Sequence, residues 1–489
     1  DWHALAQSLT LETRAFIDDA FVDAASGETF ETIDPATGEI LARVTSCDAP
    51  EAELAVGHAH RAFNHGDWSR LAPGRRKKLL LGLADLMEAH KHELALLDSL
   101  DMGKPVTSSL GDMSGAIACF RYHAESIDKL FGEVAPTGEN SLALVLREPI
   151  GVVASIVPWN FPLMMTAWKI APALAAGNSV ILKPSEKSPL SALRLAQLAR
   201  EAGLPPGVFQ VLPGFGHTVG KALALSMGVD CLSFTGSTQV GKQLLQYAGQ
   251  SNLKKLYLEC GGKSPNIVFA DCKDLDRVAR HAAEAIFHNQ GEVCIAGSRL
   301  LVENSVREAF VEKVLVAAET MQPGDPLDPK SFMGAMVDET QHRRVLDYIR
   351  KGIEEGARLR TGGQALEGKG LFIPPTVFDG VTSAMTIGRE EIFGPVLAVF
   401  GFDSEEEAVA MANDSDYGLA AGLWSQDIDR IMRVTRRLHS GQVFVNNWAG
   451  GDQTVPFGGV KQSGNGRDKS HHSLEEYSEL KMVWMSLAT

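Results

Sequence analysis

Between residues 150 and 250, runs of apolar residues alternate with segments whose apolar positions repeat every three or four residues. The apolar runs predict four strands, GVVASIVP, NSVILKP, VFQVLPG and VDCLSFTG. The periodic segments predict helices at 162–176, 189–202, 217–226 and 238–250. Because nearly continuous apolar strands that alternate with helices are typical of a parallel sheet covered on both faces, we expect a doubly wound domain. Such a domain binds its ligand at the carboxyl ends of the strands.

A second alternation of the same kind begins after KKLYLECGGKSPNIVFA, residues 254–270. Helices are predicted near 274–288, 305–320, 339–355, 404–412 and 427–438. Strands are predicted at 299–303, 396–400, 420–424 and 442–446. A second α/β domain is therefore expected.

The first 150 residues and the C-terminal tail follow other patterns. Residues 18–46 contain short β-type alternations broken by the turn signals SGE and DPATGE, which predict small antiparallel strands. Helical periodicity predicts helices at 49–66, 73–99 and about 108–131. The stretches 141–149 and 479–487 alternate like exposed strands. Because an unpaired edge strand tends to pair with another chain, they suggest a sheet shared between subunits.

Composition excludes several classes of protein. The chain has 489 residues, of which 45% are hydrophobic and 22% charged, as in ordinary globular proteins. The net charge of −15 opposes binding to nucleic-acid phosphates and to anionic lipid. No apolar run reaches the ~18 residues of a membrane-spanning helix, and the first residues lack a signal-peptide pattern. Six scattered cysteines show no metal-ligand spacing, so we expect free thiols, no metal site and a cytoplasmic protein.

Cys294, in the stretch FHNQGEVCIAGSR, is a candidate nucleophile because glycines loosen the segment around it. At an ordinary pKa of about 8.5 only a small part of a cysteine is thiolate at neutral pH, so it needs help from other groups. Most free cysteines are small buried hydrophobic residues, and the local sequence alone favours that reading.

Two further segments offer groups that a thiol needs. Glu259 stands in LECGGKSP, at a predicted strand end before two glycines, where a carboxylate could act as a general base. Asn160 stands in VPWNFP between prolines, where a rigidly held amide could donate to an oxyanion. An ion-paired acid and a turn asparagine are the ordinary alternatives.

Two strand ends indicate a nucleotide site. FTGSTQVG places Gly236, Ser237 and Gly241 where backbone N–H groups and the helix dipole suit a phosphate, although a plain turn capped by Ser237 fits equally well. LKPSE places Lys183 and Glu186 after another strand, where they could bind ribose hydroxyls. A carboxylate there favours NAD over NADP, because it repels a 2′-phosphate. The alternative is a solvated charged turn.

Taken together, these segments resemble an aldehyde dehydrogenase. PWNFP, LKPSE, FTGSTQVG, LECGGKSP, NQGEVCIAGSR, EEIFGP and PFGGVKQSG stand in the order and at the spacings of that family. The run PFGGVKQSGNGRDKS with a following ELK is most similar to the branch that oxidises γ-glutamyl-γ-aminobutyraldehyde and related ω-aminoaldehydes. The resemblance implies an α/β fold with a Rossmann-like NAD domain (1–127 and 150–261), a catalytic domain (262–462) and an antiparallel oligomerisation ribbon (128–149 and 463–489).

The resemblance also implies roles for individual residues. Cys294 would attack the aldehyde, the Asn160 side chain and the Cys294 backbone N–H would hold the oxyanion, and Glu259 would activate water to hydrolyse the thioester. Lys169 would take part in a proton relay. The implied NAD site consists of Trp159, Lys183, Ser185, Glu186, Gly236, Ser237, Gly241, Glu391 and Phe393. A homodimer or homotetramer is implied as well.

One position departs from the family, because Glu292 stands where glutamine is common. A carboxylate so near Cys294 could raise the thiol pKa, although we expect it to face away. We hypothesise that Asp112, Glu292 or Asp452 attracts a cationic substrate end. The alternatives that remain are a broad-specificity aldehyde dehydrogenase, a CoA-acylating dehydrogenase, and a non-catalytic binding or structural protein with the same fold. Glu259 favours release by water rather than by CoA.

Overall fold

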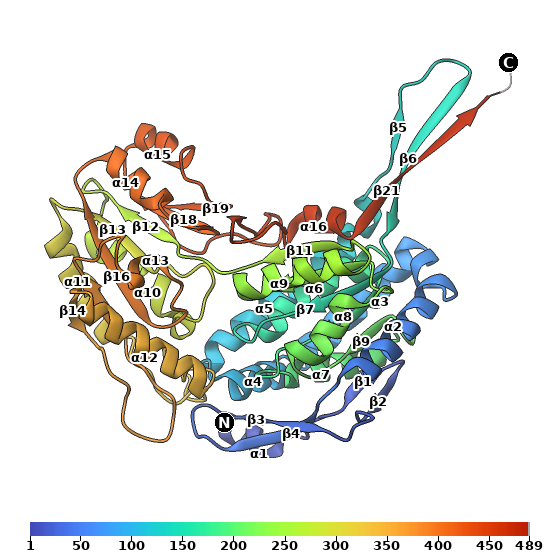
Figure 1. Ribbon diagram of the computed structural model, residues 1–489, viewed down its shortest axis with the longest axis horizontal. Coiled ribbons are helices and arrows are strands. Elements are labelled where there is room, and N and C mark those ends of the chain that lie inside the picture. The colour runs from blue at the N-terminus through green and yellow to red at the C-terminus, as the bar shows by residue number, and fades with distance from the viewer. Residues whose placement is uncertain (488–489) are drawn as a thin grey trace.

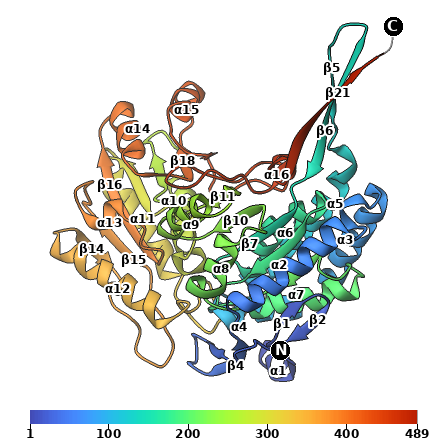
Figure 2. The same cartoon turned by 45° about the vertical axis from the view of Figure 1, so that its right-hand side comes forward.

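The computed structural model describes residues 1–487, so the last two residues of the predicted C-terminal ribbon lie outside the described part. Two seven-stranded sheets form the two main units, and a three-stranded sheet projects away from both (Figure 1). Figure 2 shows the same ribbon standing clear of the helices from a second direction. The predicted class, α/β with two sheet domains and an antiparallel ribbon, is confirmed, while the domain boundaries stay a prediction.

The first sheet has the strand order β11-β10-β7-β8-β9-β1-β2. Its five parallel strands are β7 (Val152–Ile156), β8 (Ser179–Lys183), β9 (Phe209–Val211), β10 (Cys231–Thr235) and β11 (Lys255–Glu259). From β7 the chain runs outward to β8 and β9 and then returns to the other side with β10. The carboxyl ends of β7 and β10 therefore face the crevice where this topology binds ligands.

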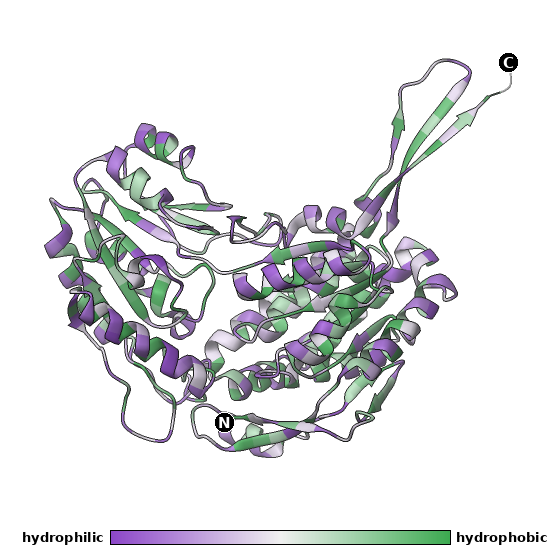
Figure 3. Cartoon of the chain, viewed as in Figure 1, coloured by the Kyte–Doolittle hydropathy of each residue, from purple (hydrophilic) through white to green (hydrophobic). Residues whose placement is uncertain are grey.

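Helices cover both faces of the first sheet. Apolar residues of α3 to α7 pack on one face with Val153, whereas those of α2, α8 and α9 pack on the other with Val152 and Ala154, as strand alternation requires. The bounds are α2 (Ala49–Asn64), α3 (Pro73–Ala89), α4 (Lys91–Met102), α5 (Val106–Ser126), α6 (Pro162–Ala175), α7 (Leu190–Glu201), α8 (Lys221–Leu225) and α9 (Thr238–Gln250). In Figure 3 the strands of this unit are largely hydrophobic and the outer helix faces are polar.

Two predictions for the N-terminal part were wrong in detail. The single helix expected at 73–99 is two helices, because His90 has the non-helical angles φ −103° and ψ 17° and separates α3 from α4. β1 (Ala15–Ile17) lies before the expected segment 18–46, and with β2 (Ala20–Val22) it extends the first sheet as an antiparallel edge. Only β3 (Thr29–Ile33) and β4 (Ile40–Thr45) form a separate pair.

The second sheet has the order β14-β15-β16-β13-β12-β18-β19. Its strands are β12 (Pro265–Val268), β13 (Arg299–Glu303), β14 (Arg358–Thr361), β15 (Thr376–Asp379), β16 (Val396–Phe402), β18 (Ala420–Trp424) and β19 (Gln442–Val445). One face packs against α10 (Leu275–Phe287) and α11 (Arg307–Glu319), and the other against α12 (Glu339–Glu354), α14 (Glu405–Asn413) and α15 (Ile428–Thr435). The four predicted strands are present, but β12, β14 and β15 were not predicted.

The two stretches expected to be exposed strands pair with each other within the chain, while a sheet shared between subunits stays a prediction. β21 (Ser478–Ser486) pairs along its whole length with β6 (Ser141–Pro149), which also pairs with β5 (Glu133–Ala135). Leu480, Met482 and Trp484 are nevertheless exposed on the edge strand β21. The remaining elements are short: α1 (Trp2–Ser8), α13 (Thr386–Arg389), α16 (Ser470–Glu476), β17 (Tyr417–Gly418) and β20 (Val460–Lys461). Within residues 1–487, no helix is long and apolar enough to span a membrane.

Candidate active site

A cavity of about 370 Å³ lies where the two units meet. The first unit contributes residues that follow β7, β10 and β11, and the second contributes Glu391 and Phe393. We call one side the α6 wall, made of Phe161, Met164, Met165, Trp168 and Phe457, and another the β10 wall, made of Thr235, Gly236, Ser237, Cys260 and Gly261. Cys294 lines the same cavity.

Cys294 lies on a loop whose backbone is unusually constrained. Asn289 and Gln290 have positive φ values of 49° and 56°, in the left-handed region that side chains other than glycine adopt rarely. The Gln290 side chain fixes the loop, because its oxygen accepts from Gly334 N–H at 2.9 Å and its amide donates to the Ala335 carbonyl at 3.1 Å. A loop held in this way presents Cys294 to the cavity in one position.

The Cys294 thiol is half-buried, and burial raises its pKa to about 12. The negative charges of Glu391 and Glu259 act in the same direction. The backbone of Gly262 lies close to that of Cys294, since a Cβ on Gly262 would lie 2.4 Å from the Cys294 carbonyl oxygen. Only glycine fits there. The free thiol is therefore neutral at physiological pH and needs a base to react.

Asn160 is buried beside Cys294. Its amide nitrogen donates to the Glu292 carbonyl oxygen at 2.7 Å, and its backbone carbonyl accepts from the Asn289 side chain at 3.1 Å. An amide nitrogen has two N–H groups, so one remains for a group in the cavity that Asn160 lines. The turn after β7 thus carries an oriented donor rather than a solvated turn asparagine.

Glu259 ends β11 and is fully enclosed. Both of its carboxylate oxygens are buried without a hydrogen-bond donor among the described residues. Burial, and then the charge of Asp468, raise its pKa well above the ordinary value. The carboxylate faces Gly458, whose Cβ would lie 2.7 Å from Oε1, and it is not among the residues that line the cavity. It is thus a proton acceptor held just outside the cavity.

The predicted relay residue Lys169 is buried in α6 and donates to both carboxylate oxygens of Asp468, at 3.0 and 2.8 Å. Its charge acts on Glu259 and lowers the pKa of that carboxyl against the larger effect of burial. Asp468 was not predicted as a site residue. The segment PFGGVKQSGNGRDK contains it, but nothing local distinguishes it from other turn acids.

The strand end after β10 has the expected form. Ser237 caps α9, with its side chain accepting from Val240 N–H at 3.3 Å, so the helix start opens toward the cavity beside Gly236. The Gly236 N–H donates to the Glu259 carbonyl at 3.0 Å. Gly241 lies in the first turn, where a Cβ would come within 2.9 Å of the Cys260 sulfur. The capped-turn reading of Ser237 is correct, and it is compatible with a ligand site.

Lys183, Ser185 and Glu186 lie at the carboxyl end of β8 and do not line the cavity itself. The Lys183 ammonium is buried, which lowers its pKa, and it donates to Glu186 at 3.2 Å. The Ser185 hydroxyl accepts from Lys187 N–H at 3.2 Å. These groups lie at the end of β8, next to the ends of β7 and β10, so a long ligand could reach them from the cavity.

Glu391 and Phe393 close the cavity from the second unit. Oε1 of Glu391 accepts from Gly262 N–H at 2.9 Å, and burial raises the pKa of this carboxyl to about 7. Phe393 meets Trp159 edge to face, with ring centroids 5.3 Å apart. Trp159 and Phe393 both line the cavity.

The three acids expected near the substrate do not line the cavity. Asp112 is buried in an ion pair with Lys104 at 2.5 Å. Glu292 is buried behind Cys294, where it accepts from Val337 N–H at 3.2 Å and burial raises its pKa well above the ordinary value. Asp452 is exposed on a loop. Glu292 thus faces away from the thiol, as expected.

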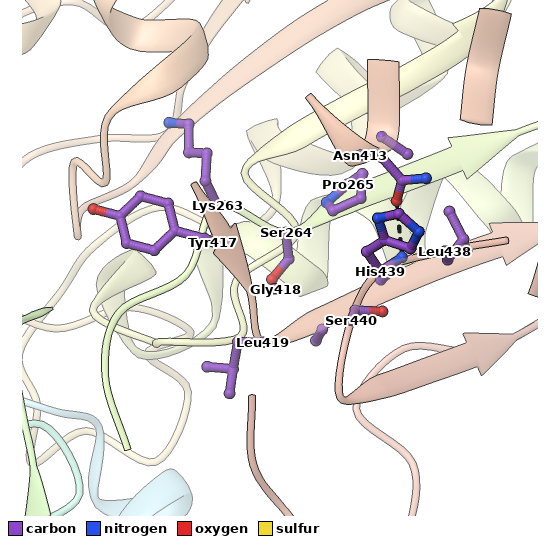
Figure 4. A pocket seen from close by; sticks show the side chains of 13 residues that line it. Lys263, Ser264, Pro265, Asn413, Tyr417, Gly418, Leu419, Leu438, His439 and Ser440 are labelled. Carbon is purple, nitrogen blue, oxygen red and sulfur yellow. Dashed lines mark hydrogen bonds between the residues drawn. The ribbon is translucent and has the colours of Figure 1, made fainter. Parts of the chain in front are cut away.

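The apolar residues of the α6 wall were not singled out from the sequence. Phe161, Met164 or Met165, and Trp168 recur at helical spacing, but a stripe of this kind usually marks a core face. A second hollow, lined by Lys263 and Tyr417 on one side and by Asn413 and His439 on the other, holds only about 10 Å³ (Figure 4). This is room for about one water molecule, so of these two hollows the cavity at Cys294 is the one with room for a substrate.

The chain belongs to the aldehyde dehydrogenase family, whose model matches residues 21–483. It is 54% identical over 487 residues to the NADP/NAD-dependent aldehyde dehydrogenase PuuC of Escherichia coli, covering 99% of this chain and 98% of that protein.

Two solved structures superpose closely. One is the indole-3-acetaldehyde dehydrogenase AldA of P. syringae in complex with NAD+ and IAA, with a TM-score of 0.99, 56% identity, and coverage of 100% of this chain and 99% of that one. The other is the γ-glutamyl-γ-aminobutyraldehyde dehydrogenase of Burkholderia cenocepacia, with a TM-score of 0.98, 54% identity and the same coverage.

Proposed function

We propose that this protein oxidises an aldehyde to a carboxylic acid with NAD+, through a covalent intermediate on Cys294. The observation that carries the proposal is that Cys294 and the oriented amide of Asn160 line one cavity, while the buried carboxylate of Glu259 lies just outside it. None of the three could do this chemistry alone, and they come from separate segments of the chain.

The reaction begins when Cys294 loses its proton and its sulfur forms a bond to the aldehyde carbon. The carbonyl oxygen becomes an oxyanion, which accepts hydrogen bonds from the free N–H of Asn160 and from the Cys294 backbone. Bound NAD+ accepts the hydride that leaves this carbon, so that a thioester on Cys294 remains. Glu259 then takes a proton from water, whose oxygen attacks the thioester carbon, and the C–S bond breaks to release the acid.

Burial raises the pKa of both Cys294 and Glu259, so the thiol must give up a proton and the Glu259 carboxylate binds one readily. A carboxylate in a buried site is a stronger base than a solvated one, so Glu259 can accept the thiol proton as well as that of water. Asp468 and Lys169 lie next to Glu259 and offer a route for the proton to leave.

The residues at the strand ends fit a dinucleotide. The β10 wall has small side chains, and the α9 start that Ser237 caps offers backbone N–H groups to a pyrophosphate. Lys183 and Glu186 at the end of β8 would bind the adenine ribose, with Ser185 beside them and Gly241 allowing close helix packing. Trp159, Glu391 and Phe393 would surround the nicotinamide ribose. Glu186 favours NAD over NADP because a carboxylate repels a 2′-phosphate.

An ω-aminoaldehyde is the substrate class that similarity to the γ-glutamyl-γ-aminobutyraldehyde dehydrogenase of Burkholderia cenocepacia supports. The buried carboxylate of Glu259 favours water rather than CoA as the group that releases the acyl product from the thioester on Cys294. The exposed apolar residues of β21 support a homodimer or homotetramer, and the free cysteines are in keeping with the cytoplasm.

The test is NAD+ reduction, followed by NADH absorbance, with aliphatic, aromatic, amino, guanidino and γ-glutamylated aldehydes. Cys294→Ala should lower kcat by about 10⁴-fold or more, because no covalent intermediate can form. Cys272→Ala, which removes another half-buried free cysteine, is the matched control and should leave kcat unchanged. NADH formation by Cys294→Ala at the unsubstituted rate, or none by the unchanged protein with any aldehyde, would contradict the proposal.

A further inference from the structure

The loop after β8 and the start of α12 meet at the rim of the cavity. Lys187 follows β8 in the first unit, and Asp338 precedes α12 in the second. Their side chains form an ion pair, with Nζ of Lys187 2.7 Å from Oδ2 of Asp338. Lys187 also lines the cavity. The ion pair therefore joins the two units directly beside the space that a ligand would occupy.

Both partners of this ion pair are held in place by other contacts. Oδ1 of Asp338 accepts from Gln341 N–H at 2.8 Å and caps α12, which leaves Oδ2 for Lys187. The Lys187 backbone N–H donates to the Ser185 hydroxyl at 3.2 Å, and its ammonium lies 5.3 Å from the centre of the Trp159 ring. Because both residues are anchored in this way, the pair forms with a smaller loss of side-chain entropy than two free surface residues would suffer.

The start of α12 also supports the segment that closes the cavity from the second unit. The Gln341 side chain donates to the carbonyl oxygens of Ile392 and Phe393, at 3.2 and 2.7 Å. Phe393 meets the edge of Trp159, whose ring also lies next to the Lys187 ammonium. The ion pair and the aromatic contact thus join the two units on the same side of the cavity.

Three charged residues line the described part of the cavity, namely Lys187, Arg344 and Glu391. Arg344 donates to the Glu391 carbonyl at 3.0 Å, and the Glu391 carboxylate accepts from a backbone N–H. Among these three, Lys187 is the one that forms an ion pair with a described residue. The Lys187 and Asp338 side chains are 26% and 33% exposed, so water can reach the pair and allow it to open and close.

We infer that Lys187 and Asp338 are positioning residues that latch the two units together beside the cofactor, and that opening of this ion pair controls how fast NAD+ enters and NADH leaves. The inference rests on NAD+ as the cofactor and goes beyond the proposed function, which concerns the chemistry at Cys294. A latch must open when a ligand enters and again when it leaves, so its loss speeds both steps and leaves the affinity nearly unchanged. A direct bond to the cofactor would change the affinity instead.

The test measures binding of NADH without turnover, by stopped-flow fluorescence and by isothermal titration. Asp338→Asn removes the charge and keeps the cap of α12, because asparagine caps helices as well as aspartate does. Association and release of NADH should both become faster by about twofold to fivefold, as expected for the loss of a partly exposed ion pair. The dissociation constant should stay within about twofold. Lys187→Met should act in the same way, since its apolar stem still covers Trp159.

Three comparisons separate the ion pair from a general loss of structure. The double variant should be no faster than either single variant, because each removes the same interaction. Lys187→Arg should keep slow release, and added salt should speed release in the unchanged protein more than in Asp338→Asn. The matched control is Lys313→Met, which breaks the exposed ion pair between Lys313 and Asp276 and should leave both rates unchanged.

A weaker affinity for NADH in Lys187→Met, with no change in Asp338→Asn, would mean that Lys187 binds the cofactor directly. Unchanged rates in both variants would mean that the ion pair does not restrain the two units. Either result overturns the inference, while NADH formation from an aldehyde by the unchanged protein still upholds the proposed function. A failure of the unchanged protein to bind NADH at all would contradict both.

Discussion

The two walls of the cavity are built from opposite kinds of side chain. The α6 wall presents Phe161, Met164, Met165, Trp168 and Phe457, whereas the β10 wall presents Thr235, Gly236, Ser237, Cys260 and Gly261. The first wall is a stripe of large apolar groups on and beside one helix. The second is the set of residues at which two parallel strands end and the next segments begin.

This difference separates two kinds of recognition. Large apolar side chains bind by burying area and tolerate many shapes, which suits a substrate chain. Small residues at a strand end and helix start expose backbone N–H groups at fixed positions, which suits the phosphates of a cofactor. Cys294 lines the same cavity as both walls, so we expect each reactant to reach it from its own side. Substitutions can test this division.

The largest effect is expected for Glu259→Gln, which changes the buried acid at the end of β11, just outside the cavity. It should lower kcat by about 10² to 10⁴-fold, because the buried base is lost. Since burial raises the pKa of Glu259, the carboxylate of the unchanged protein forms only as pH rises, so kcat/KM should increase with pH through that titration. In Glu259→Gln this limb should be absent, and only the rise from the Cys294 thiol at alkaline pH should remain.

Glu292→Gln is the matched control for this pH profile, because it also replaces a buried carboxyl near Cys294. It should keep the Glu259 limb. A limb that vanishes in Glu292→Gln and persists in Glu259→Gln would exchange the roles of the two acids.

Asn160→Ala should lower kcat by about 10² to 10³-fold, because the oxyanion loses a donor. KM for both reactants should change little, since the amide acts on charge that develops during the reaction. Rapid-quench and steady-state kinetics would measure this, with the exposed Asn304→Ala as control. A change in KM alone would place Asn160 in ordinary substrate binding.

On the β10 wall, Gly261→Ala should raise KM for NAD+ by about tenfold and leave KM for the aldehyde unchanged. A Cβ there would lie 2.1 Å from Oε2 of Glu391 and would push that side chain from its bond to Gly262 N–H. Gly249→Ala in α9, where a Cβ meets nothing within 4 Å, is the control. Isothermal titration with NAD+ would check the result, and a matching change for the aldehyde would show that the walls are not separate.

On the α6 wall, Met164→Ala should raise KM for long aldehydes by about threefold to tenfold, because less apolar area is buried. KM for NAD+ should be unaffected, and Met227→Ala on an exposed site is the control. This is the smallest expected effect, since methionine is readily replaced by rearrangement of its neighbours. Weaker NAD+ binding in Met164→Ala would show that the α6 wall and the β10 wall do not bind separate ligands.

The elements around the cavity were predictable where the pattern is local. The strands β7, β8, β9 and β10 and the helices between them follow from apolar periodicity, because burial on one or both faces repeats with the geometry of the element. The break at His90 did not follow, since both α3 and α4 have helical periodicity and the change of direction depends on packing against other helices.

The interaction partners of individual side chains were harder to predict from the sequence. Lys169 was marked as a relay residue, but its partner Asp468 is 299 positions away and resembles any other turn acid in the sequence. The candidates Asp112 and Glu292 were chosen for charge and rough position, and burial placed one in an ion pair and the other behind the cysteine loop. β21 and β6 were seen as two unpaired strands, although they pair with each other across the chain.

The sequence by itself determined the class of fold and the family, and it singled out Cys294, Glu259 and Asn160 as the candidate reactive groups, because periodicity and motifs are properties of neighbouring residues. The tertiary structure alone decided which charges are neutralised, which face the cavity and what lies behind its walls. These depend on distances between residues that are remote in the chain, and on burial, which sets the pKa of each group after the chain has folded.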